Sequence, residues 1–166
     1  MTGRIYQLNV SGGGVPKLPV AAAHVGDLGL EGDAHRGAQH GGPERAVCLY
    51  ALELIERLQA EGHPIVPGAV GENVTLHGID FATVTPGTRL HLGPEVVLEV
   101  TRYTTPCVNI TAAFLDGDFS RILHNTHPGE SRVYARVIQG GRLATGDDVR
   151  VATPSLATDG AGQGSI

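Results

Sequence analysis

Short runs in which apolar and polar residues alternate recur along this chain, and glycine-rich turns separate them. The clearest run covers residues 95–102, where Val96, Leu98 and Val100 lie on one face of a predicted strand. The same reasoning predicts strands in other parts of the chain. These predicted strands cover residues 3–10, 17–25, 45–50, 88–92, 131–138 and 148–152, and residues 68–76 form a glycine-led turn that enters a further strand.

Helical periodicity is rarer than alternation in this sequence. Residues 51–61 form the clearest predicted helix, because Leu52, Ile55 and Leu58 recur at helical spacing. Residues 109–124 are expected to form a helix in two pieces, broken near Gly117. Many short strands with few helices predict a mainly β fold, a barrel with a few peripheral helices. We expect one domain over residues 1–153 and a disordered tail over residues 154–166, which are small, polar and glycine-rich.

The composition is that of a globular protein and excludes several classes of partner. Of the 166 residues, 41% are hydrophobic and 17% are charged. Only 4% are aromatic and the formal charge is −5, which argues against nucleic acid as a partner. The N-terminus lacks the apolar segment of a signal peptide, and no apolar run approaches membrane-spanning length. A cytoplasmic, reducing location is therefore expected, with no membrane partner.

The two cysteines differ in their surroundings. Cys48 lies within the apolar run 46–49, so we expect it in the core. Cys107 follows Pro106, which cannot donate a hydrogen bond in a sheet and should end the preceding strand. On a loop at a strand end, the Cys107 thiolate could serve as a nucleophile, a sulfur carrier or a soft metal ligand. The alternative from this segment alone is a buried apolar side chain.

Three glycine-containing segments are candidates for ligand contacts. Residues 26–44 form a long loop with glycines and polar side chains that could approach an anion, with Arg45 just beyond it. A solvated surface loop is the alternative for this segment. Glu72 and Asn73 could form hydrogen bonds at the start of a strand or line a pocket. Residues 12–17 lack the spacing of a phosphate loop and predict a hairpin-like connection instead.

Taken in order, several short motifs resemble the MOSC domain family, which is named for its occurrence at the C-terminus of molybdenum cofactor sulfurases. The resemblance covers about residues 4–152, and no single motif is specific without the others. The matching motifs are Gly32-Asp33-Ala34-His35, His40-Gly41-Gly42-Pro43-Glu44-Arg45-Ala46-Val47, Gly71-Glu72-Asn73, Gly87-Thr88-Arg89-Leu90, Pro106-Cys107, Gly140-Gly141-Arg142-Leu143 and Gly146-Asp147.

The resemblance implies a MOSC-type β-barrel and a molybdenum cofactor, the pterin compound molybdopterin. It also implies that Cys107 carries sulfur or binds molybdenum, as catalytic residue and metal ligand. A phosphate and a polar ring would need glycine N–H groups, arginine and asparagine around them. The residues expected to line the cofactor are His40, Gly41, Gly42, Arg45, Asn73 and Arg102, followed by Asp33, His35 and Arg36.

The chain is similar to the small stand-alone bacterial members of the family. It is expected to lack the fused pyridoxal-phosphate desulfurase domain, so the family's association with pyridoxal phosphate applies only at the family level. Three functions stay open: a molybdenum-dependent oxidoreductase that reduces N-hydroxylated compounds, a persulfide carrier that works with a separate cysteine desulfurase, and a pterin- or anion-binding module without turnover. The expected partners are a small-molecule substrate or sulfur acceptor, with a separate desulfurase or electron donor.

Overall fold

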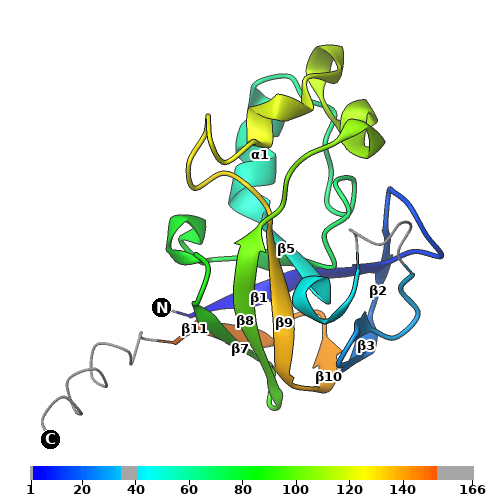
Figure 1. Ribbon diagram of the computed structural model, residues 1–166, viewed down its shortest axis with the longest axis vertical. Helices are drawn as coiled ribbons and strands as arrows, with labels where there is room; N and C mark the ends of the chain where they lie inside the picture. Colours follow the sequence, from blue (N-terminus) through cyan, green and yellow to red (C-terminus); the bar gives the residue numbers. More distant parts are fainter. Residues whose placement is uncertain (1, 35–40, 153–166) are drawn as a thin grey trace, which may run out of the picture.

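A closed ring of seven strands organises residues 2–34 and 41–152, the part of the chain that the computed structural model describes (Figure 1). Pairing between the first and the last strand closes the ring. In order around the barrel, the strands are β1 (Thr2–Val10), β11 (Asp148–Val151), β7 (Arg89–Leu92), β8 (Val96–Tyr103), β9 (Val133–Gln139), β5 (Val47–Ala51) and β6 (Val74–His77). The predicted mainly β barrel is confirmed.

One pair of neighbouring strands in this ring is parallel. β5 and β6 run in the same direction, with Leu49 opposite Val74, whereas the other described pairs of the ring are antiparallel. Parallel neighbours cannot be joined by a tight hairpin and need a longer crossover. The helix α1 (Leu52–Ala60) lies in that crossover and confirms the predicted helix.

Two smaller elements extend the barrel. β2 (Leu18–Val20) pairs with the end of β1, so residues 12–17 connect a hairpin as predicted. A second sheet has the order β10 (Gly141–Ala144), β3 (Ala22–Gly26) and β4 (Gly29–Leu30). The alternation of the sequence therefore indicates most strands, whereas β4 lies in the segment predicted as a long loop and β10 was not predicted.

Burial follows the alternation along the strands. In β8, Val96, Leu98 and Val100 are each buried and face the core, while the residues between them are partly exposed. β5 is different, since all five of its residues are buried. α1 packs its apolar side chains, including Ile55 and Leu58, against the core and exposes its charged side.

The predicted two-piece helix over residues 109–124 is wrong. The chain instead forms three short 3₁₀ helices, Val108–Ala113, Leu115–Gly117 and Phe119–Ile122. Asp116 and Gly117 have φ angles of 57° and 69°, in the left-handed region that an α-helix cannot contain. Figure 1 shows this segment, in yellow-green, at the same end of the molecule as α1.

No helix in the described ranges is long and apolar enough to cross a membrane. The predicted tail over residues 154–166, together with the boundary at residue 153, lies outside the described residues.

Candidate functional site

Cys107 lies where β8 has ended and the first 3₁₀ helix begins. Residues 104–107 are extended, and Cys107 precedes that helix with a φ of −145° and a ψ of 179°. The N–H of Thr104 donates to the carbonyl of Arg132 at 2.9 Å, which holds this segment against the start of β9. The thiol is partly exposed, as expected for a side chain at a strand end.

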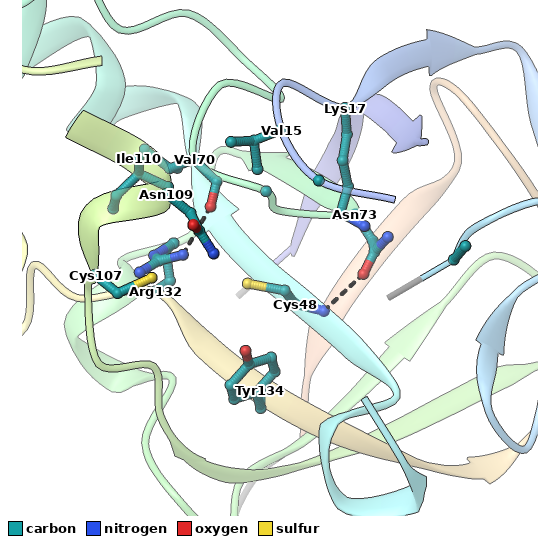
Figure 2. A pocket seen from close by; sticks show the side chains of 13 residues that line it. Val15, Lys17, Cys48, Val70, Asn73, Cys107, Asn109, Ile110, Arg132 and Tyr134 are labelled. Atoms are coloured by element: carbon teal, nitrogen blue, oxygen red, sulfur yellow. Dashed lines mark hydrogen bonds between the residues drawn. The ribbon is translucent and has the colours of Figure 1, made fainter. Parts of the chain in front are cut away.

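Cys107 opens onto a pocket built from segments that are far apart in the sequence (Figure 2). The cavity volume is about 80 Å³. Since a water molecule needs roughly 10–15 Å³ measured in this way, the pocket has room for about half a dozen water-sized groups. The lining residues are Gly14, Val15, Lys17, Ala34, Cys48, Val70, Gly71, Asn73, Cys107, Asn109, Ile110, Arg132 and Tyr134.

Asn73 joins the pocket wall to β5. Its Oδ1 accepts from the backbone N–H of Cys48 at 3.0 Å, and its own N–H donates to the Cys48 carbonyl at 2.7 Å. Its Nδ2 donates to the carbonyl of Asn9 and to Asp33 Oδ2. Asn73 therefore forms hydrogen bonds at a strand start and also lines the pocket. The two roles that the sequence suggested as alternatives are both present.

Asp33 and Lys17 form an ion pair at the edge of the pocket. Lys17 Nζ lies 2.7 Å and 2.8 Å from the two carboxylate oxygens of Asp33. The side chains are 8% and 2% exposed, so solvent screens the pair little. The carboxylate also accepts from the N–H of Ser11 and from the amide of Asn73. Asp33 therefore orders the Asn73 side of the pocket, and Lys17 is neutralised locally.

Arg132 is the buried cation of the pocket. The residue is 6% exposed, and its Nη1 donates to the carbonyl of Val70 at 2.7 Å. Its Nε has no hydrogen-bond partner. Figure 2 shows the guanidinium next to Cys107 and Asn109. Buried donors without partners are rare in folded proteins, so this group is a candidate for contact with a ligand.

Cys48 and Tyr134 complete the wall opposite Arg132. Burial raises the pKa of the Cys48 thiol to about 11, although the positive charge of Arg132 opposes that change. Burial, with a smaller effect from Cys48, raises the pKa of Tyr134 to about 12. Both groups therefore stay protonated at neutral pH. Cys48 is 5% exposed, which confirms that it packs in the core, yet its side chain also reaches the pocket.

The structure brings only part of the predicted set to the pocket. Cys107 and Asn73 line it, and Asp33 contacts Asn73 from behind. The Arg45 guanidinium lies 5.9 Å from the centre of the Tyr134 ring, and Arg102 is exposed; neither lines the pocket. Gly41 and Gly42 do not line it either, whereas His35, Arg36 and His40 lie outside the described residues.

Sequence reasoning missed Lys17, Cys48, Arg132 and Tyr134 as lining residues. Arg132 carried one signal, because an arginine at the start of an apolar strand must either reach solvent or find buried partners. No group of three or more His, Cys, Asp or Glu side chains suited to a metal ion occurs within the described residues. The polar side chains that line the pocket are two thiols, two amides, a phenol, an ammonium and a guanidinium.

Comparison with known proteins identifies a matching family and several relatives. A family model described as the MOSC domain matches residues 36–150. YflK of Bacillus subtilis (strain 168) is 30% identical over 141 residues, which cover 83% of this chain and 62% of YflK. A protein of Gibberella moniliformis named Reductase is 32% identical over 126 residues, which cover 73% of this chain and 22% of that protein.

A solved structure agrees with these sequence matches. The crystal structure of YiiM from Geobacillus stearothermophilus is similar with a TM-score of 0.70 and 25% identity, covering 93% of this chain and 77% of that one. The chain spans less than two thirds of the length of both YflK and the Gibberella protein.

Proposed function

Because this chain belongs to the MOSC domain family, we propose that its pocket binds the metal-bearing end of a molybdenum–pterin cofactor and that Cys107 is the protein ligand of the metal. The observation that supports the proposal most strongly is the convergence of Cys107, Asn73 and Arg132 on one cavity from three distant segments. The reaction class that we propose is the reductive removal of oxygen from an N-hydroxylated compound.

The donors in the pocket fit such a cofactor. A thiolate is a soft ligand suited to a thiophilic metal. The described residues supply no cluster of histidines or carboxylates, so the metal would have to arrive with ligands of its own. The unpartnered Nε of Arg132 is a buried donor suited to an anionic oxygen. The cavity of about 80 Å³ has room for one end of the cofactor rather than for the whole molecule.

When bound, such a cofactor supplies the two-electron redox centre that the reaction requires. Reduction of an N-hydroxyl group consumes two electrons and two protons and releases water, and the electrons would come from a separate donor. Tyr134 is suited to donate a hydrogen bond to the substrate, since its raised pKa of about 12 keeps the phenol protonated. The buried thiol of Cys48 stays neutral for the same reason and leaves Cys107 as the accessible sulfur.

The similarity to a protein named Reductase supports a reductive reaction. We propose that the cofactor extends beyond the cavity. Outside it, the cofactor would contact the other residues predicted from the sequence, which are Gly41, Gly42, Arg45, Arg102, His35, Arg36 and His40. The substrate contacts are proposed to come from the partly exposed mouth of the pocket, where Asn109 lies.

Metal analysis of matched cysteine variants tests the proposal. The wild-type protein and the variants Cys107→Ser and Cys48→Ala would be purified from a host that makes the cofactor. We expect molybdenum in the wild type and in Cys48→Ala, and its loss in Cys107→Ser with an unchanged circular dichroism spectrum. Equal molybdenum in both variants, or none in the wild type, would refute the role of Cys107 as ligand.

The partial exposure of the Cys107 thiol also suits a second function, persulfide transfer. In that reaction a separate cysteine desulfurase would place a sulfur atom on Cys107, which passes it to an acceptor. Intact-mass analysis distinguishes the two functions, because a carrier would gain the mass of one sulfur atom at Cys107 and hold no metal. A protein that retains the cofactor without turnover would instead be a binding module.

A further inference from the structure

Arg132 carries a charge that the described residues do not neutralise. The residue is 6% exposed, and its Nη1 donates a hydrogen bond to the uncharged carbonyl of Val70. Within residues 2–34 and 41–152, no carboxylate forms an ion pair with it. Removing a charge from water without a counter-ion costs several kcal/mol, so a buried guanidinium normally has an anionic partner.

Glu72 is the nearest candidate for a counter-ion within the protein, and it does not serve as one. Its Oε2 accepts from the N–H of Gly68 and the hydroxyl of Thr75, while its Oε1 has no hydrogen-bond partner. Burial raises the pKa of Glu72, while its hydrogen bonds and the charge of Arg132 oppose this change. Burial thus favours the neutral form of this carboxyl group, which would not compensate the charge of Arg132.

The other cations near the pocket have different roles. Lys17 is bound by both carboxylate oxygens of Asp33, at 2.7 Å and 2.8 Å. Arg45 lies over the ring of Tyr134, and Arg102 is exposed. Among the described residues that line the cavity, Arg132 is therefore the cation with donors left over for a ligand.

We propose that Arg132 is the anion-binding residue of the pocket and that it recognises a tetrahedral oxyanion of the phosphate or sulfate type next to Cys107. The planar guanidinium can bind two oxygens of such a group at once, and the cavity is large enough for its five non-hydrogen atoms. This inference adds an anion contact to the proposed function, and it rests on that function because both use the same pocket. The oxyanion is either the phosphate of the bound cofactor or a free ion.

Alkylation of Cys107 provides a test that requires no metal. The wild-type protein, purified from a host that does not make the cofactor, would react with anionic iodoacetate and with neutral iodoacetamide, and the label on Cys107 would be mapped by mass spectrometry. Free glutathione gives the reference ratio of the two rates. We expect a higher iodoacetate-to-iodoacetamide ratio at Cys107 than in glutathione. Inorganic phosphate should slow the reaction with iodoacetate more than sodium chloride of equal ionic strength does.

Variants then assign the effect to Arg132. Arg132→Gln should lower the ratio about tenfold or more, the change expected for loss of a charge-assisted hydrogen bond. Arg102→Gln removes an exposed arginine outside the pocket and should leave the ratio unchanged. Arg132→Lys keeps the positive charge, so it still tests the proposal if the glutamine variant fails to fold. It should retain only part of the effect, because lysine cannot bind two oxygens at once as a guanidinium does.

The source of the oxyanion is distinguished by calorimetric titration of inorganic phosphate, because Cys107 would be bound to metal in cofactor-loaded protein and could not be alkylated. Loss of phosphate binding in protein from a host that makes the cofactor indicates that the cofactor's own phosphate occupies Arg132, whereas binding equal to that of cofactor-free protein indicates a free ion. If wild-type Cys107 shows the glutathione ratio and no protection by phosphate, Arg132 only supports the Val70 carbonyl and the proposal is wrong. Failure of the molybdenum test alone would not change these measurements.

Discussion

Removal of the Asp33 carboxylate should destabilise the fold strongly, because it would leave a buried ammonium without a partner. Lys17 Nζ contacts both oxygens of Asp33, and the two side chains are 8% and 2% exposed. Breaking a buried ion pair by removing one partner typically costs about 3–5 kcal/mol. The Asp33→Ala variant would also remove the acceptor of the Ser11 N–H and of the Asn73 amide, so we expect a value near the upper end of that range.

Urea unfolding followed by circular dichroism measures the effect. For a domain of this size the dependence of the unfolding free energy on urea is about 1–3 kcal/mol per molar. A loss of about 4 kcal/mol with a slope of about 2 therefore lowers the midpoint by about 2 M. Lys17→Met should also destabilise the fold, since it removes the ammonium that contacts both oxygens of the buried Asp33 carboxylate.

The double variant Lys17→Met/Asp33→Ala separates burial of a lone charge from loss of packing. Replacing both partners by apolar side chains is often neutral or stabilising, so the double variant should be more stable than either single variant. If Asp33→Ala lowers the midpoint by less than about 0.5 M, or if the two single losses simply add in the double variant, the buried pair does not act as described.

Three further predictions follow from other residues. Because burial raises the pKa of Glu72 above its ordinary value of 4.5, its stabilising effect is complete below that value and is lost as the pH rises through the raised pKa. Glu72→Gln should thus gain stability relative to the wild type as the pH rises above 4.5 and through the raised pKa, and a difference in urea midpoints that stays constant with pH would contradict this. At about pH 8 only about one Cys48 thiol in a thousand is ionised at a pKa of about 11, so mass mapping should find iodoacetamide on Cys107 first. Gly68 and Gly87 have similar positive φ angles of 89° and 94°. A Cβ atom added at Gly68 would lie 2.3 Å from the Lys17 carbonyl oxygen, whereas a Cβ atom at Gly87 would meet nothing within 4 Å. Gly87→Ala should cost about 1–2 kcal/mol and Gly68→Ala about 1–3 kcal/mol more, and equal urea midpoints would show that the close contact relaxes freely.

The barrel strands were predictable because their signals are local. Alternation over residues 95–102 and the proline at 106 indicated where β8 runs and ends, and β8 ends at Tyr103. The 3₁₀ helices after Cys107 were not predicted, because their apolar spacing resembles that of a helix and the left-handed turn at Asp116 has no strong sequence signal.

Most of the pocket lining depends on contacts between distant segments. Arg132 was interpreted only as part of an alternating strand, since its partner is the carbonyl of Val70, 62 residues away. Lys17 ended a segment that was correctly predicted as a hairpin connection, and the same connection also forms a pocket wall. Asn73 was identified from the sequence, because a motif of the MOSC type places a polar side chain at a strand start.

The way in which the barrel closes has a consequence for its biosynthesis. One edge of β1 is shared by two partners: residues Leu8–Val10 pair with β2, and residues Thr2–Arg4 pair with β11. β2 leaves the ribosome soon after β1, but β11 follows about 140 residues later, a delay on the order of ten seconds at usual elongation rates. During that interval the first residues of β1 present an unpaired strand edge, which is a template for pairing with other chains. A nascent or truncated chain without β11 is therefore the form of this protein most prone to aggregation.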